Sequence, residues 1–147
     1  MLGKVSTFLK MPVSAKLLAT EAVFMLCLAE IYRRYARLKR ITATLGGPVE
    51  QTHVTPKSDD LSEILAVGKM VETVAKALPF ELLCYSQAVA AKWMLNRRGL
   101  ASTLYFGVWS GSEAEHSIDA HAWVAVENRI IIGGAESKTC QVIAAFS

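Results

Sequence analysis

Cysteine, histidine and long apolar runs are all scarce in this sequence, and each shortage disfavours a class of protein. The three cysteines are an odd number at long, unequal spacings with no CxxC pair, which argues against a disulfide framework and a structural zinc site. With only three histidines as well, we predict no metal site and no cofactor. The longest apolar region, Leu17 to Ala29, is broken by Thr20 and Glu21 and is too short to span a bilayer.

A large net charge is also missing. The formal charge is only +3, with both signs scattered along the chain, which does not suit a nucleic-acid-binding surface. Unpaired cysteines favour a reducing, cytoplasmic compartment, and the N-terminal residues contain no signal-peptide pattern. A chain of 147 residues can bury a real core as one domain. We therefore predict a single cytoplasmic domain over residues 1–147.

Helical periodicity dominates the first two thirds of the chain. The predicted helices span Val13 to about Leu45, Leu61 to Leu78, and about Leu82 to Arg97. Ser58 or Asp59 can cap the second helix, and Pro79 ends it. Gly99, which follows two arginines, is typical of a glycine stop at the end of the third helix. These helices divide the domain into an N-terminal helical region, 1–47, and a catalytic core, 61–147.

Strand patterns follow the helices. The predicted strands are Thr103–Trp109, Asp119–Val126 and Arg129–Ile132, and Glu127 and Asn128 form the turn between the last two. Helices first and antiparallel strands second indicate an α+β fold, with the third helix packed on a small antiparallel sheet.

A basic stretch ends the first predicted helix. It contains Arg33, Arg34, Arg37, Lys39 and Arg40. Cations near a helix C-terminus are typical of a solvated helix face. The alternative is a surface that holds an acidic peptide segment, a carrier protein or the anionic lipids of a membrane surface.

Cys84 and His121 are the candidate reactive pair. Cys84 falls in the first turn of the third helix, where unpaired N–H groups favour a thiolate and can form part of an oxyanion hole. His121 lies on a strand, on the same side as Asp119 and Trp123, where it can accept the thiol proton and later protonate a leaving amine. A buried, inert cysteine fits the helix pattern equally well, and a lone histidine is more often structural. The ordered set of helix-start cysteine, strand and strand histidine favours the catalytic interpretation.

An acid that orients the imidazole is harder to assign. A two-residue turn would place Gly134 opposite His121 and Glu136 opposite Asp119. Either acid, a backbone carbonyl or a water could then hold the imidazole. We favour Asp119, because its position does not depend on the hairpin continuing past Gly133 and Gly134.

Two segments resemble the lasso-peptide leader peptidases, which are transglutaminase-like cysteine proteases of bacterial peptide biosynthesis. They are CYSQAVAAKWMLNRRGLASTLYFGV, residues 84–108, and DAHAWVAVENRIIIGG, residues 119–134. The region from Pro12 to Leu26 is also similar to the N-terminal region of that family. In one respect the chain departs from it: many relatives carry an aspartate where this chain has Gly133 and Gly134, so the third triad member cannot be carried over.

The resemblance implies a function for the Cys84 and His121 pair. They would cut a ribosomally made precursor between leader and core, before a separate ATP-dependent lasso cyclase closes the macrolactam. The chain resembles the stand-alone form of the family, which implies a separate small leader-recognition protein as a further partner. Two alternatives stay open: acyl transfer to an amine through the same thioester, and a non-catalytic scaffold in which Cys84 is buried.

Overall fold

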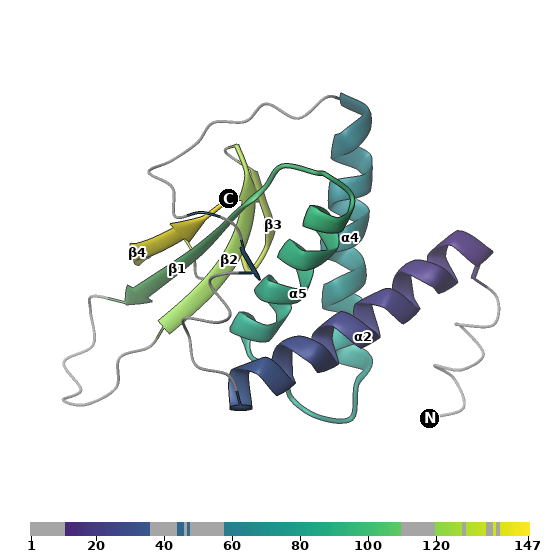
Figure 1. The fold of residues 1–147 in the computed structure, drawn as a ribbon, viewed down its shortest axis with the longest axis horizontal. Helices are drawn as coiled ribbons and strands as arrows, with labels where there is room; N and C mark the ends of the chain where they lie inside the picture. The colour runs from purple at the N-terminus through teal and green to yellow at the C-terminus, as the bar shows by residue number, and fades with distance from the viewer. Residues whose placement is uncertain are drawn as a thin grey trace.

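The computed structural model describes residues 11–35, 44–45, 47, 58–109, 120–127, 129–134, 137 and 139–147. Its helices are α2 (Val13–Tyr35), α4 (Ser58–Ala77) and α5 (Cys84–Arg97), and its strands are β1 (Thr103–Trp109), β2 (Ala120–Val126), β3 (Arg129–Ile132) and β4 (Cys140–Phe146). Figure 1 shows the helices on one side of the molecule and the sheet on the other. The predicted α+β order of helices followed by antiparallel strands is confirmed.

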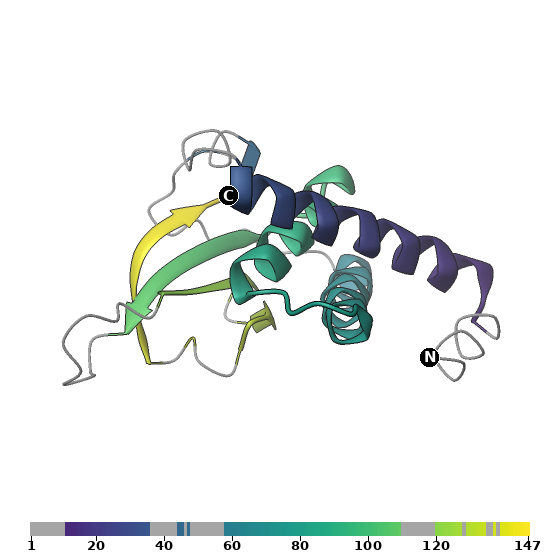
Figure 2. The ribbon, with the colours of Figure 1, turned by 90° about the horizontal axis from the view of Figure 1, so that it is seen from below.

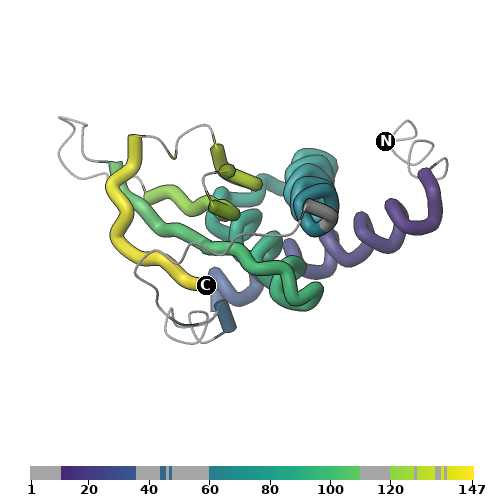
Figure 3. The backbone as a smooth tube through the Cα atoms, turned by 90° about the horizontal axis from the view of Figure 1, so that it is seen from above, coloured from purple at the N-terminus to yellow at the C-terminus, as the bar shows by residue number. Residues whose placement is uncertain are grey.

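The four strands form one antiparallel sheet in the order β3-β2-β1-β4. The strand β4 was not predicted from the sequence. It pairs with β1 at the edge of the sheet, and Figure 3 shows the two running side by side. The hairpin β2–β3 supplies the opposite edge, so the sheet is assembled around the central pair of β1 and β2.

The helix α5 lies between α2 and the sheet. It contacts α2 through one face and β2 through another, as Figure 2 shows. Its buried residues Met94 and Leu95 share a core cluster with Leu26 of α2 and Val124 of β2. The helices that pack on the sheet also include α4, which contacts β3. The two approach so closely that a Cβ at Gly68 would lie 2.6 Å from the carbonyl oxygen of Ile131.

The helix ends agree with the sequence in part. The first helix begins at Val13 as predicted, and the Pro12 carbonyl accepts a hydrogen bond from Lys16 N at 3.0 Å. Its predicted extension to Leu45 crosses residues 36–43, which lie outside the described residues. The second helix begins at Ser58, three residues before the predicted start. The prediction that Ser58 or Asp59 caps this helix is therefore wrong, because both lie within its first turn.

The pairing of β2 with β3 differs from the predicted hairpin. The turn was predicted correctly, since Val126 pairs with Arg129. The register then shifts between Val124 and Ala125, so that Val124 pairs with Ile132. A regular hairpin would pair it with the preceding residue of β3. The prediction that put Gly134 opposite His121 is therefore wrong, because the shift displaces each later partner by one residue.

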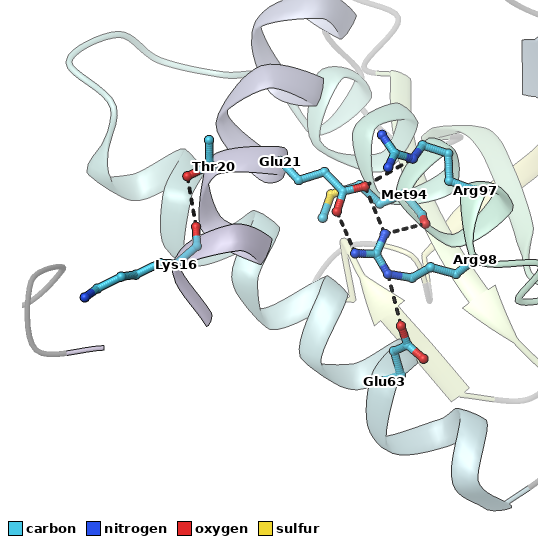
Figure 4. A network of polar contacts seen from close by, with 7 residues as sticks. All are labelled: Lys16, Thr20, Glu21, Glu63, Met94, Arg97 and Arg98. Atoms are coloured by element: carbon cyan, nitrogen blue, oxygen red, sulfur yellow. Dashed lines mark hydrogen bonds and ion pairs between the residues drawn. The ribbon is translucent and has the colours of Figure 1, made fainter. Parts of the chain in front are cut away.

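Carboxylates of α2 bind both ends of α5. At the C-terminal end, Glu21 accepts two hydrogen bonds from Arg98, at 2.6 and 2.9 Å, as Figure 4 shows. At the N-terminal end, Ser86 Oγ donates to Glu30 Oε2 at 2.7 Å. These contacts make the two helices antiparallel.

The basic stretch of α2 is partly engaged inside the molecule. Arg33 and Arg34 both pair with Glu30, at 2.6 and 2.8 Å, so neither is simply a solvated cation. Its other three basic residues lie outside the described residues. Among the helices that the structure describes, none is long and apolar enough to cross a membrane.

Candidate active site

Cys84 is the first residue of α5. The preceding residue, Leu83, is extended (φ −66°, ψ 156°) and supplies no side-chain cap, and the first turn contains no acidic residue. Backbone N–H groups in a first helical turn have no acceptor within the helix and carry partial positive charge. A thiolate or a developing oxyanion at this end would therefore meet N–H donors and no carboxylate of the same turn.

The residues that follow Cys84 fix this turn to the rest of the domain. The Tyr85 ring stacks on Phe106, with 5.7 Å between centroids. Burial raises the pKa of Tyr85, so its hydroxyl stays neutral at ordinary pH. Ser86 donates to Glu30, whose pKa is lowered to about 2 chiefly by its hydrogen bond from Arg33. The carboxylate that Ser86 contacts is thus paired with arginine.

His121 lies near the start of β2 and is held by backbone. Its Nε2 is 2.8 Å from the carbonyl oxygen of Gly133, and its ring stacks on Trp123 with 5.9 Å between centroids. Trp123 in turn stacks on Tyr105 of β1. A carbonyl oxygen can only accept a hydrogen bond, so Nε2 must carry the proton. In the neutral ring the lone pair is then on Nδ1.

Cys84 and His121 line the same cleft, which has a volume of about 300 Å³. Its walls come from α4, α5, β2 and the end of β3, and consist of Glu72, Lys76, Cys84, Gln87, His121, Ile132, Gly133 and Gly134. The Cys84 Sγ lies 4.0 Å from the carbonyl oxygen of Ala120, the residue before His121. Among the described side chains, no direct hydrogen bond joins Sγ to the imidazole. Catalytic hydrogen bonds are often long without substrate and tighten when it binds.

The two acids predicted to orient the imidazole fall in parts of the chain that the structure does not describe. Asp119 and Glu136 both lie outside the described residues, so their roles stay predictions. Among the described residues, the Gly133 carbonyl matches one of the holders considered from the sequence, a backbone carbonyl.

Three polar side chains of the cleft were missed from the sequence. Gln87 lies almost one helical turn after Cys84, a spacing that could have pointed to it, and its Nε2 donates to the Leu82 carbonyl at 2.8 Å. Glu72 and Lys76 reach the cleft from α4. No local pattern in the sequence indicates that this helix approaches Cys84.

Disulfide formation and metal binding are the other chemistries to consider in the described part of the chain. None of the three cysteines forms a disulfide within the described structure, and all three are half-buried. Within the described residues, no cluster of three histidine, cysteine, aspartate or glutamate side chains could hold a metal ion.

Comparison with known proteins gives the family. Residues 25–145, most of the chain, match the transglutaminase-like superfamily, whose members are typically cysteine peptidases or transferases. No curated protein and no solved structure matches the chain. The match includes the helix that begins with Cys84 and the strand that carries His121, and the α+β fold agrees with it. The chain belongs to the transglutaminase-like superfamily.

Proposed function

We propose that this protein is a cysteine peptidase that removes the leader from a ribosomally made precursor peptide, as in lasso-peptide maturation before macrolactam closure. The observation that carries the proposal is the shared cleft of Cys84 and His121. Membership of a superfamily of cysteine peptidases and transferases supports the chemistry. The resemblance of residues 84–108 and 119–134 to leader peptidases supports the substrate class.

The proposed acylation uses the two side chains that share the cleft. The neutral imidazole of His121 takes the thiol proton of Cys84 on Nδ1, and the sulfur attacks the carbonyl carbon of the scissile bond. The resulting oxyanion accepts hydrogen bonds from N–H groups in the first turn of α5. The imidazolium then returns the proton to the leaving amine, which breaks the peptide bond and leaves a thioester on Cys84.

Deacylation uses the same imidazole in the opposite sense. His121 takes a proton from a water molecule and the hydroxide attacks the thioester carbonyl. The C–S bond then breaks, the acid is released, and the proton returns to the sulfur. An amine in place of water would give acyl transfer. The superfamily contains both kinds of enzyme, so the choice between them is made at this step.

The proposal includes a small leader-recognition protein that delivers the precursor and an ATP-dependent cyclase that consumes the core peptide. A row of apolar side chains along α2 supports docking of the recognition protein. Leu17, Phe24 and Ile31 are 68%, 62% and 53% exposed, and their spacing of seven residues puts them on one face of the helix. Phe24→Glu should weaken cleavage of delivered precursor while leaving the circular dichroism spectrum unchanged.

Mass spectrometry of the reaction products tests the proposed reaction. Purified protein, precursor peptide and recognition protein should give two fragments whose masses sum to that of the precursor plus one water. A fragment joined to an added amine would instead show an acyltransferase. Intact precursor under all conditions would contradict both enzymatic functions and favour the scaffold.

Alkylation separates the enzyme from a scaffold without any substrate. Because the three thiols are similarly half-buried, access alone should not separate their rates with iodoacetamide near neutral pH. We expect Cys84 to react at least about tenfold faster than Cys27 or Cys140, because the His121 imidazole in the same cleft can take its proton. Equal rates at all three would contradict a reactive role for Cys84.

A further inference from the structure

Gly133 turns the chain at the end of β3 in a conformation that other residues avoid. Its φ is +79°, in the left-handed region where a Cβ is disfavoured. The space around it is closed as well. A Cβ at this position would lie 2.8 Å from the carbonyl oxygen of Ala122 and 3.0 Å from the Cβ of Trp123. Both the backbone angle and the packing therefore require glycine here.

This turn places a backbone acceptor beside the imidazole. The register shift in the β2–β3 ladder comes just before Gly133, and its carbonyl oxygen lies 2.8 Å from His121 Nε2. The close contacts of Gly133 are to Ala122 and Trp123, the two residues that follow His121. Gly133 thus packs against the part of β2 that carries His121. Backbone contacts therefore fix the position of the acceptor relative to the histidine.

We propose that the Gly133 carbonyl positions His121 for catalysis by accepting the hydrogen bond from its Nε2. It holds the proton on Nε2 and keeps the lone pair on Nδ1, the nitrogen that exchanges a proton with Cys84. This inference rests on the proposed function, because the tautomer matters to the reaction only if His121 serves Cys84. Gly133 is a positioning residue, since it acts through the imidazole.

A spectroscopic measurement tests the contact without any activity. Nitrogen-15 NMR of the wild-type protein, at a pH where the imidazole is neutral, should show His121 as the Nε2–H tautomer. Its Nε2 proton should exchange slowly with water, because it is held in a hydrogen bond. A ring protonated on Nδ1, or an Nε2 proton in fast exchange, would overturn the inference whatever the protein cleaves.

The matched variants are Gly133→Ala and Gly99→Ala. Gly99 also has a positive φ, +68°, but a Cβ there would meet nothing within 4 Å, and it lies at the opposite end of α5 from Cys84. Both variants should lose stability through backbone strain. Only Gly133→Ala should lose the slowly exchanging Nε2 proton. Its kcat should also fall about 10- to 100-fold with KM little changed, which is the loss typical of removing a group that orients a functional histidine.

The outcomes separate this inference from the proposed function. Gly133→Ala with wild-type kcat and an unchanged Nε2 proton would overturn the positioning role. The same would follow if Gly99→Ala lowered kcat equally, because the loss would then report strain in general. Should Gly133→Ala fail to fold, the wild-type NMR measurement still decides. Failure of the wild type to cleave any precursor would count against the proposed function and not against the contact.

Discussion

The two ends of α5 are built in opposite ways. At the C-terminal end, Gly99 has a positive φ and the N–H groups of Gly99 and Leu100 return to Asn96 and Leu95, both at 3.0 Å, which completes a Schellman motif. Arg98 adds hydrogen bonds to three separate groups. At the N-terminal end, the helix begins on a reactive residue type with no side-chain cap.

This difference assigns a task to each end of the helix. A capped and ion-paired C-terminus fixes the helix axis against α2, while the uncapped N-terminus leaves N–H groups for a substrate. Rigid attachment at a distance from the reactive atom is how a scaffold holds a nucleophile in one geometry. Substitution of Cys84 should therefore affect chemistry, and changes to the contacts that attach the helix to α2 should affect stability.

Cys84→Ala gives the largest expected effect, and it changes only the uncapped N-terminal end of α5. Cleavage of the precursor should fall at least about 1,000-fold, because Cys84 is the thiol that lines the cleft with His121. The measurement is the initial rate of fragment formation, with Cys27→Ala and Cys140→Ala as matched controls that retain the wild-type rate. Thermal unfolding should change little, since Cys84 is half-buried and makes one weak contact. Cleavage that survives this substitution would remove Cys84 from the mechanism.

Arg98→Met acts on the capped C-terminal end of α5 and should lower the stability of the folded protein. The side chain of Arg98 is 21% exposed and that of Glu21 is 15% exposed, so the substitution leaves a largely buried carboxylate without its main partner. We expect urea denaturation to show a loss of about 2 kcal/mol in the free energy of unfolding. The kcat of the folded protein should stay close to wild type.

A double variant serves as the control for this pair. Glu21→Gln combined with Arg98→Met removes both charges and should recover part of the loss. A loss below about 0.5 kcal/mol in the single variant would mean that the ion pair is no stronger than a surface pair, and the contrast between the two ends would then rest on the glycine cap alone.

Glu30→Gln tests the attachment of the N-terminal end through the pH dependence of stability. Hydrogen bonds from Arg33, Ser86 and Arg34 lower the pKa of Glu30 from 4.5 to about 2. A carboxylate with a lowered pKa stabilises the folded state above its unfolded pKa, and that contribution is lost as the pH falls from about 4.5 towards 2. We discount the effect for the exposure of Arg33 and Arg34, and expect the wild type to lose about 1 to 2 kcal/mol more than the variant across this window.

Chemical denaturation at pH 6, 4 and 2.5 measures this difference. Parallel loss of stability in both proteins would show that other carboxylates carry the acid sensitivity. Ser86→Ala is a matched variant, because it removes one donor to Glu30 while the arginine pairs remain, and it should shift the acid transition by less than Glu30→Gln does.

What the sequence predicts well is what local chemistry determines. The end of α5 at Arg97 and both ends of β1 match the prediction, because the glycine stop and the apolar strand pattern depend on neighbouring residues only. The pairing of Cys84 with His121 in one cleft was also predicted, since a helix start and a strand are each recognisable locally. The strand β4 was missed, because its pairing partner is β1, more than 30 residues away.

Register and backbone acceptors are the features that the sequence leaves open. Both Ile131 and Ile132 are buried in the core cluster, and a regular strand would turn one of them away from it. The register shift in the β2–β3 ladder accompanies the burial of both, and no local pattern in the sequence indicates it. The role of the Gly133 carbonyl cannot be predicted from the sequence either. Every residue has a backbone carbonyl, and only the fold determines which one contacts His121.

Lys92 lies midway along α5 and carries the smallest predicted effect. Its side chain is buried, with the residue 2% exposed, and Nζ donates to the Ser102 carbonyl at 2.6 Å. Burial lowers the pKa of Lys92 from 10.5 to about 8, so the unfolded chain binds more protons than the folded one between these values. Stability should therefore rise with pH in this window.

Between pH 7 and 9 only part of the window is crossed, and we expect the wild type to gain about 1 kcal/mol relative to Lys92→Met in urea denaturation. A wild type that loses stability relative to Lys92→Met over this range would show that the ammonium is stabilised in the core, and that the middle of α5 is held by charge as its C-terminal end is.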